Sequence, residues 1–330
     1  MNNNTDLDNL ISKIQTGDIT SLSKAITLVE SSKSNHQALA LNLLSKLSPN
    51  KNKTFRIGIS GSPGVGKSTF IDTFGEMLCS LGHKVAVLAV DPSSEISKGA
   101  ILGDKTRMEN LSKNPRAFIR PSASGGTLGG VAKRTRETVT LCETAGFDVM
   151  LIETVGVGQS EIVVKSLVDF FLLLVQSGSG DELQGIKKGI VEIADTLVVT
   201  KDDGTNQNIV RITKAEYENA LHYLSPINDF WFPKVLTCSA IDNIGLDNIW
   251  GNIKEFYLKA ENEHYIFQNR KKQEVVWYQN NIFEEVKNML LKNPKFKSMF
   301  NKYSIEIAEN KTNSSIAYEK SKEILKSILG

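Results

Sequence analysis

The chain has 330 residues, 40% of them hydrophobic and 23% charged, which is enough to bury one full-sized core with additional segments around it. Lys plus Arg number 39 and Asp plus Glu 37, and the net charge of +2, with both signs interspersed, argues against a nucleic-acid-binding protein. The three cysteines match no metal-ligand or CxxC spacing, which predicts reduced thiols in the cytoplasm.

The amino-terminal segment is expected to be a helical arm. Residues 1–50 carry apolar side chains at helical spacing, beginning with Leu7, Leu10, Ile11 and Ile14. The first residues have neither the basic region nor the apolar stretch of a signal peptide, and no apolar run of about 18 residues occurs in the chain. We therefore expect no export and no membrane span.

Short apolar runs then alternate with helix-length segments as far as about Ala240, which predicts an α/β domain with a mostly parallel sheet and helices on both faces. The runs predicted to be buried strands are Phe55–Ser60, Lys84–Val90, Phe147–Glu153, Phe170–Gln176, Thr196–Thr200 and Val235–Ser239. Beyond Asn248 the strand signal fades, and Ile266–Leu291 and Ile305–Leu329 have the composition of a second helical region.

The clearest motif lies between the first predicted strand and the helix that follows it. The segment Gly61–Thr69 fits the P-loop pattern GxxxxGK[ST], in which backbone N–H groups and a helix N-terminus surround phosphate oxygens. Lys67 is expected to reach the β- and γ-phosphates, and Ser68 to supply a hydroxyl to Mg²⁺. The predicted nucleotide-binding residues here are Gly61, Ser62, Pro63, Gly64, Val65, Gly66, Lys67, Ser68 and Thr69.

Acidic residues at strand ends are the usual source of further Mg²⁺ ligands in such proteins. Asp91 and Glu153 each follow a predicted strand, so both are candidates for the inner or water-mediated metal shell. Gly156 is expected to donate its N–H to the γ-phosphate. The next residue is Val157, which cannot orient the attacking water. Gln159 could replace it only after loop rearrangement, so we predict slow GTP hydrolysis that a partner accelerates.

Two later segments resemble the guanine-reading elements of GTPases. Thr200-Lys201-Asp202-Asp203 matches [NT]KxD, in which the Asp203 carboxylate would accept from guanine N1–H and the exocyclic amine while Lys201 covers the ring. Ser239, Ala240 and Ile241 occupy the SA position. Thr200 stands where Asn is commoner, so one amide contact is missing and guanine affinity is expected to be weaker. Adenine recognition, with Asp203 as a helix cap, is the alternative.

Several longer segments together resemble the MeaB/ArgK family of G-protein chaperones of methylmalonyl-CoA mutase. These segments are Asp91–Ser94, Ile101–Met108, Thr127–Gly130, Glu153–Glu161 and Gly180–Gly189. The resemblance covers roughly residues 50–250 and implies a helical arm over 1–50, a P-loop GTPase domain over 51–258 and a helical dimerisation region over 259–330. It implies a GTPase that gates adenosylcobalamin loading onto an acyl-CoA mutase and protects or reactivates that enzyme.

The resemblance also assigns residues that composition alone leaves as loop acids or a charged helix start. It makes Asp104 a Mg²⁺ or switch residue beside Ser68, Asp91 and Glu153. It implies a third switch loop that couples nucleotide state to the mutase, through Asp181, Glu182, Gln184 and Lys187. The family is typically homodimeric. The chain has no Asp-x-His-x-x-Gly segment, so the cobalamin would belong to the partner.

Two departures from the family pattern affect the switch and the base site. Residues 95–100 read Glu-Ile-Ser-Lys-Gly-Ala where a Thr-Gly-Gly-Ser pattern is usual, so Lys98 and Ala100 alter a loop expected to respond to GTP. Thr200 is the other departure. Two alternatives stay open: a P-loop ATPase or kinase linked to amino-acid transport, and a GTPase serving a different metalloenzyme, although the four histidines are isolated.

Overall fold

The computed structural model describes residues 3–31, 33–47, 54–90, 108–121, 128–154, 160–178, 188–224 and 228–329. They form two compact units, Met1–Gln273 and Glu274–Gly330. The strands of the first unit are β1 (Phe55–Gly61), β2 (Val85–Val90), β3 (Ala117–Arg120), β4 (Val149–Thr154), β5 (Phe170–Gln176), β6 (Thr196–Thr200) and β7 (Lys234–Thr237). The helices of this unit include α1 (Asn3–Gln15), α2 (Ile19–Glu30), α3 (Ser34–Lys46), α4 (Lys67–Ser80), α6 (Leu128–Thr144), α7 (Ser160–Lys165), α9 (Lys188–Glu192), α10 (Gln207–Leu221) and α11 (Leu246–Asn262).

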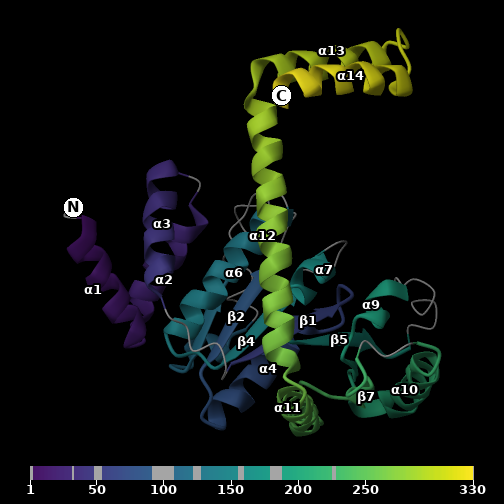
Figure 1. Cartoon of the computed structure of the whole chain (residues 1–330). Coiled ribbons are helices and arrows are strands. Elements are labelled where there is room, and N and C mark those ends of the chain that lie inside the picture. The colour runs from purple at the N-terminus through teal and green to yellow at the C-terminus, as the bar shows by residue number, and fades with distance from the viewer. Residues whose placement is uncertain are drawn as a thin grey trace. The chain divides into compact units, whose positions relative to one another are not determined.

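The described strands form one seven-stranded sheet in the order β3-β2-β4-β1-β5-β6-β7, and every neighbouring pair is parallel. Helices cover both faces of this sheet (Figure 1). The predicted fold class, a P-loop nucleoside-triphosphatase domain with helices on both faces, is confirmed. All six predicted strands are present, with ends that differ by at most two residues. The edge strand β3 was not predicted, because its apolar run is only three residues long, Ala117–Ile119, shorter than the runs that indicate a strand.

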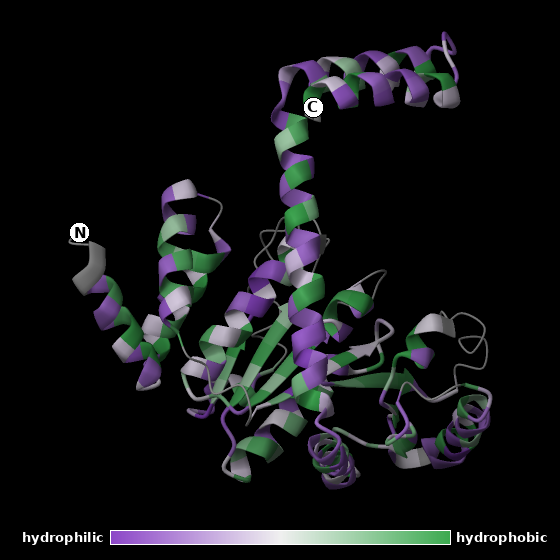
Figure 2. Ribbon diagram, viewed as in Figure 1, coloured by the Kyte–Doolittle hydropathy of each residue, from purple (hydrophilic) through white to green (hydrophobic). Residues whose placement is uncertain are grey.

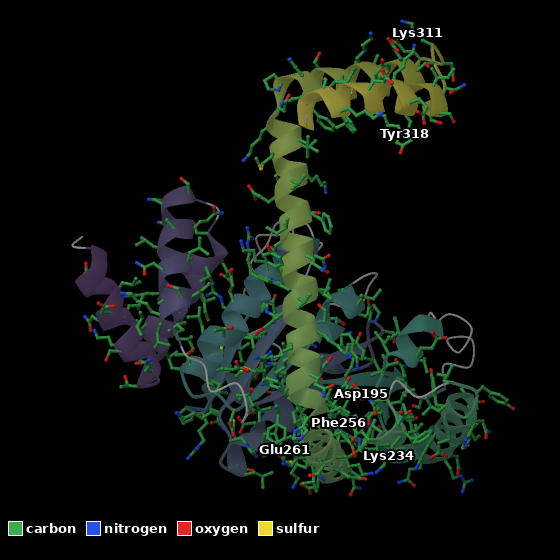
Figure 3. All side chains as sticks on the ribbon, viewed as in Figure 1. Asp195, Lys234, Phe256, Glu261, Lys311 and Tyr318 are labelled. Atoms are coloured by element: carbon green, nitrogen blue, oxygen red, sulfur yellow. The ribbon has the colours of Figure 1, made fainter. Side chains whose placement is uncertain are left out.

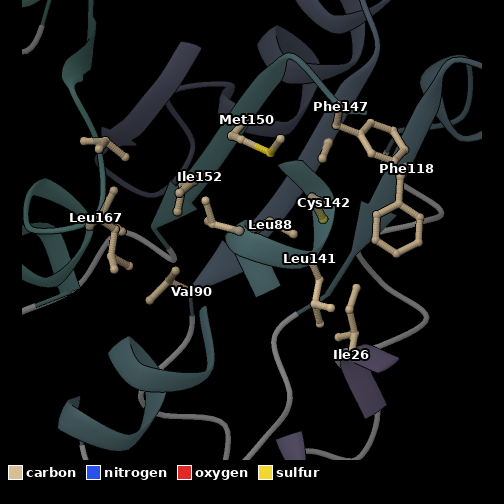
Figure 4. Packing of buried hydrophobic residues seen from close by; sticks show 14 of the residues in the cluster. Ile26, Leu88, Val90, Phe118, Leu141, Cys142, Phe147, Met150, Ile152 and Leu167 are labelled. Carbon is tan, nitrogen blue, oxygen red and sulfur yellow. The ribbon is translucent and has the colours of Figure 1, made fainter. Parts of the chain in front are cut away.

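The strands are largely hydrophobic along their length (Figure 2). Alternate residues of each strand point to opposite faces, so the sheet divides two apolar cores. Leu88 and Val90 of β2 and Met150 and Ile152 of β4 pack with Cys142 of α6 on one face (Figure 4). The other face buries the alternate strand residues against helices α4 and α11. All three cysteines are buried, and each is a free thiol.

The amino-terminal arm consists of α1, α2 and α3, and α2 packs against α6. Helix α2 begins with Asp18 as N-cap, whose carboxylate accepts from the N–H of Ser21 at 2.7 Å. Ile26 of α2 is fully buried in the same core as the sheet residues (Figure 4). An ion pair between Glu30 and Arg120 further joins the end of α2 to the end of β3.

A buried polar network lies at the amino-terminal ends of the central strands β1 and β5. Arg270 donates from Nε and Nη2 to the two carboxylate oxygens of Asp169, at 3.0 and 2.6 Å. The Tyr257 hydroxyl donates to Asp169 at 3.0 Å and accepts from the N–H of Arg56 at 2.7 Å. The Arg56 guanidinium in turn makes bonds of 2.7 and 2.9 Å to Glu143. The network thus joins β1, β5, α6, α11 and the first turns of α12 (Tyr265–Lys292).

The second unit contains the part of α12 from Glu274 onward, together with α13 (Pro294–Ala308) and α14 (Ser314–Leu329). Helices α13 and α14 pack against each other. Figure 3 labels Tyr318 of α14 and Lys311, which lies in the turn between the two helices. Asn293 caps α13 by accepting from two backbone N–H groups of its first turn. Many apolar side chains of this unit are exposed, including Phe283 at 71% and Met289 at 64%.

Candidate functional site

The P-loop joins the end of β1 to the start of α4, as the sequence predicts. A Cβ atom added at Gly61 would lie 2.5 Å from the carbonyl oxygen of Leu174, so β5 leaves room only for glycine. Gly66 caps α4 with a φ of 97°, in the left-handed region that favours glycine. Between them the side chain of Val65 is fully buried. The loop therefore curves around the N-terminus of α4, where backbone N–H groups are available to an anion.

Lys67 is the first residue of α4, and its ammonium group lies within the P-loop. Its Nζ atom donates to the carbonyl oxygens of Gly61 and Ser62 at 2.7 and 3.1 Å. Burial lowers the pKa of Lys67, and the negative charges of Glu153 and Glu161 oppose that shift. A cation held in this way at the carboxyl end of β1 is suited to a phosphate ligand.

Two of the four predicted metal ligands, Glu153 and Ser68, lie in described elements that adjoin the P-loop strand β1. Glu153 is 9% exposed, near the end of β4, in register with Ile59 of β1 and Ala89 of β2. The half-buried Ser68 lies in the first turn of α4. A carboxylate and a hydroxyl are hard oxygen donors of the kind that Mg²⁺ prefers, so these residues fit the ion. The other two proposed ligands, Asp91 and Asp104, lie outside the described residues.

The structure brings the two predicted guanine-reading segments together at the ends of β6 and β7. The Ser239 hydroxyl lies 3.4 Å from a carboxylate oxygen of Asp203 and 3.2 Å from one of Asp242. Asn206 donates to the other oxygen of Asp203 at 3.3 Å. Lys201 is half-buried and has a φ of 63°, whereas Ile241, after Ser239 and Ala240, is 75% exposed. Ala240, between Ser239 and Ile241, is half-buried.

Thr200 makes a contact that the sequence did not suggest. Its hydroxyl donates to the carbonyl oxygen of Val65 in the P-loop at 2.8 Å, and lies 3.3 Å from the carbonyl oxygen of Val175. The hydroxyl therefore connects the strand that leads to Lys201 and Asp203 with the phosphate-binding loop. Thr in place of the commoner Asn removes an amide at this position, but a donor remains.

The remaining predicted residues fall outside the described part of the chain. They are Gly156 and Gln159 after β4, and the third switch residues Asp181, Glu182, Gln184 and Lys187. The same holds for the altered loop over residues 95–100. Among the described residues no group of three His, Cys, Asp or Glu side chains could hold a metal ion by itself. Nor does any helix in the described ranges have the length and apolarity needed to cross a membrane.

Sequence reasoning missed several side chains beside the site. Asn206 and Asp242 contact the base-reading residues, and the negative charge of Glu161 raises the pKa of Lys67 against the effect of burial. Asn206 and Asp242 each lie three residues from the motif residue that they contact, a spacing at which side chains in a turn commonly meet. The sequence showed Glu161 only as the last residue of the segment Glu153–Glu161, which resembles the MeaB/ArgK family.

Comparisons with known proteins agree with this geometry. Residues 22–295 match the family model described as "Methylmalonyl Co-A mutase-associated GTPase MeaB". The chain is 46% identical to "GTPase ArgK" of Escherichia coli (strain K12) over 310 residues, covering 94% of each chain. It is also 46% identical over 290 residues to "Methylmalonic aciduria type A homolog, mitochondrial" of Mus musculus, covering 85% of this chain and 70% of that protein.

Among solved structures, "Crystal structure of LAO/AO transport system kinase" superimposes with a TM-score of 0.80 at 39% identity, covering 99% of both chains. The family match, the relatives and the P-loop between β1 and α4 lead to one assignment. The chain belongs to the MeaB family of P-loop GTPases.

Proposed function

We propose that this protein is a Mg²⁺-dependent GTPase that acts as a chaperone of an adenosylcobalamin-dependent acyl-CoA mutase, with methylmalonyl-CoA mutase as the first candidate. The observation that carries the proposal is the pairing of a complete P-loop with Asp203 and Ser239 on the same edge of the sheet. The first would bind the phosphates and the second would recognise the base. The names of the matched family and of the mouse relative support the choice of partner.

In this proposal each described residue has a defined task. The P-loop from Gly61 to Thr69 surrounds the phosphates, and Lys67 neutralises charge on the β- and γ-phosphates. Ser68 and Glu153 hold Mg²⁺, which would neutralise charge that develops during hydrolysis. The residues proposed to complete the hydrolytic site are Asp91, Asp104, Gly156 and Gln159, and those proposed to couple it to the mutase are Asp181, Glu182, Gln184 and Lys187.

Base selection would depend on Asp203, assisted by Lys201, Ser239, Ala240 and Ile241. The half-buried carboxylate of Asp203 would accept from guanine N1–H and the exocyclic amine, whereas adenine leaves it without these donors. Calorimetry with GDP and ADP tests this directly, and GDP should bind much more tightly. Asp203→Asn should lose GDP but accept xanthosine diphosphate, whose 2-oxo group can take a hydrogen bond from the amide. Equal binding of ADP and GDP would reject the assignment.

We further propose that the protein is a homodimer in the cytoplasm and that hydrolysis is slow until the mutase binds. Exposed apolar side chains of the second unit support dimerisation, since a helical unit with such residues is suited to packing on a copy of itself. Sedimentation at micromolar concentration tests the dimer. A turnover by the isolated protein that equals the rate with the mutase would contradict the proposed stimulation.

The partner is tested by affinity capture from native lysate with and without a non-hydrolysable GTP analogue. Recovery of a cobalamin-dependent mutase that changes with the nucleotide is the expected result. The Lys67→Ala variant, which should bind phosphate poorly, is the matched control and should lose the nucleotide effect. Recovery of a transport component would instead favour a transport-linked kinase, the activity for which the similar solved protein is named. Recovery of another metalloenzyme would favour a GTPase that serves that enzyme.

A further inference from the structure

A pair of hydroxyl groups lies on one face of the sheet, where β1 and β4 end beside the P-loop. Ser60 Oγ and Thr154 Oγ1 are 2.9 Å apart and form a hydrogen bond between the two side chains. Ser60 is 1% exposed and Thr154 is fully buried. Burying a hydroxyl among apolar groups is costly unless it has a partner, and here each hydroxyl is the partner of the other. Loss of either group would therefore leave the other without this bond.

The hydroxyl bond continues the contact between β1 and β4 beyond their backbone pairing. The ladder between these strands ends at Ile59 and Glu153, one residue before the hydroxyl pair. On its other side β1 stays paired with β5 as far as Gly61, so Ser60 is held by a strand that does not depend on β4. The end of β2 is the other strand neighbour of Thr154. Toward β1, the last residue of β4 is thus held by the side chain of Ser60.

The hydroxyl pair and the proposed metal ligand of β4 lie on opposite faces of the sheet, because successive residues of a strand alternate in direction. Leu151 lies in the core that α4 covers, and Glu153, two residues later, points the same way. Ile152 lies in the opposite core, and Thr154 points with it. Glu153 therefore faces the side of α4, whose first turn carries Ser68. Thr154 cannot reach a metal ion on that side and can act on it only through the strand.

Helix α7 packs on the face of the sheet that carries the hydroxyl pair. A Cβ atom added at Gly58, two residues before Ser60, would lie 2.8 Å from Val164 Cγ1, so α7 and β1 are in close contact. The first turn of α7 buries Ser160 and Glu161, which are 0% and 4% exposed. Water therefore has little access to this face and cannot easily replace the bond when one hydroxyl is removed.

We propose that Thr154 is a positioning residue for the metal: its hydroxyl bond to Ser60 holds the end of β4 where Glu153 can serve Mg²⁺ beside Ser68. This inference rests on the proposed binding of guanine nucleotide and Mg²⁺ at the P-loop. Without the bond the end of β4 can move away from β1, and the Glu153 carboxylate moves with it. Mg²⁺ demands near-ideal octahedral geometry, so a displaced ligand weakens its binding. The contacts of the P-loop with the phosphates do not depend on the bond.

The test is calorimetry of a non-hydrolysable GTP analogue, with Mg²⁺ and with EDTA, on the full chain and on Thr154→Val. Valine stays branched and apolar in the strand and lacks only the hydroxyl. We expect the increase in affinity that Mg²⁺ gives to fall about fivefold, as for loss of one buried hydrogen bond. The affinity in EDTA should stay that of the wild type. Thr154→Ser keeps the hydroxyl and should restore the effect of Mg²⁺.

Two further variants separate the hydroxyl bond from its contribution to stability. Ser60→Ala removes the other hydroxyl and should lower the effect of Mg²⁺ as Thr154→Val does, with no further loss when both changes are combined. Thr196→Val is the matched control, because Thr196 is also fully buried and its hydroxyl accepts from Asn252 at 2.6 Å. Thr196 lies at the opposite end of the sheet, where β6 begins. Its loss should lower the free energy of unfolding and leave the effect of Mg²⁺ unchanged.

Three results would overturn the proposal. The first is a Mg²⁺ effect in Thr154→Val equal to that of the wild type. The second is an equal loss of affinity with Mg²⁺ and with EDTA, which would indicate a disturbed P-loop. The third is the same loss in Thr196→Val, which would indicate general destabilisation. In these cases a wild type that responds to Mg²⁺ leaves the proposed nucleotide and metal site intact. A wild type that does not respond would reject the metal site and the role of Thr154 with it.

Discussion

The hydroxyl of Thr200 offers the most direct test of how the base and phosphate parts of the site depend on each other. Thr200→Val keeps the shape of the side chain but removes the donor to the Val65 carbonyl at 2.8 Å. An unsatisfied buried carbonyl costs about 1–3 kcal/mol. We expect the free energy of unfolding to fall by about that amount, because Thr200 is only 5% exposed and water cannot easily replace the bond.

The same change should weaken nucleotide binding. Val65 lies at the centre of the P-loop, so loss of its anchor leaves the loop less well ordered for the phosphates. If about 1.4 kcal/mol of the loss appears in binding, GDP affinity falls about tenfold. Calorimetry with GDP and urea denaturation measure the two effects separately. Thr200→Ser keeps the hydroxyl and should stay close to the wild type, and Thr200→Asn tests the expected weaker guanine affinity. A valine variant with unchanged GDP affinity would refute the reasoning.

Three further predictions concern other parts of the first unit. Asp169→Asn should lower the free energy of unfolding by about 3–5 kcal/mol in urea, because it removes the carboxylate charge that pairs with the buried Arg270 guanidinium. Glu255→Gln, at an exposed ion pair, should change it by less than about 1 kcal/mol. Burial raises the pKa of Glu137 to about 7 from 4.5. The carboxyl group is uncharged in both states below pH 4.5, and the folded state loses stability as pH rises from 4.5 to about 7, because only the unfolded chain then ionises freely. Relative to Glu137→Gln, the wild type should lose roughly 3 kcal/mol across that window, and a pH-independent difference would contradict the shift. Lys67→Ala should reduce phosphate release from GTP at least about a hundredfold, and retained turnover would exclude Lys67 from the phosphate site.

The sequence predicted the elements whose signal is local. The P-loop is continuous in the chain, and its flanking strand and helix are amphipathic or apolar over enough residues to be recognised. Strand β5 was predicted with its observed ends, since Phe170–Gln176 is an almost uninterrupted apolar run buried on both faces. In contrast, Ala117–Arg120 is too short to stand out, since only three of its residues are apolar.

Contacts between distant residues could not be predicted in the same way. Thr200 and Val65 are 135 residues apart, and Arg270 and Asp169 are 101 apart, so neither pairing leaves a spacing to recognise. The sequence could show only that Thr200 lacks the amide of Asn. The structure shows that its hydroxyl has a different partner, in the P-loop. Similarly, the burial of Glu161 depends on how α7 packs on β1.

The strand order gives the two ends of a bound nucleotide different neighbours. Strand β1 has β4 and β2 on one side and β5, β6 and β7 on the other, so a nucleotide on the P-loop would place its phosphates toward Glu153 and its base toward Asp203. On the side of Glu153, strand β4 contacts α7. On the same side of β1, beyond β2, strand β3 is joined to the amino-terminal arm by the ion pair between Arg120 and Glu30. The base side borders β7. Loss of the γ-phosphate should therefore be sensed on the side of Glu153, whereas the base side is joined to the P-loop by the hydrogen bond from Thr200 to Val65.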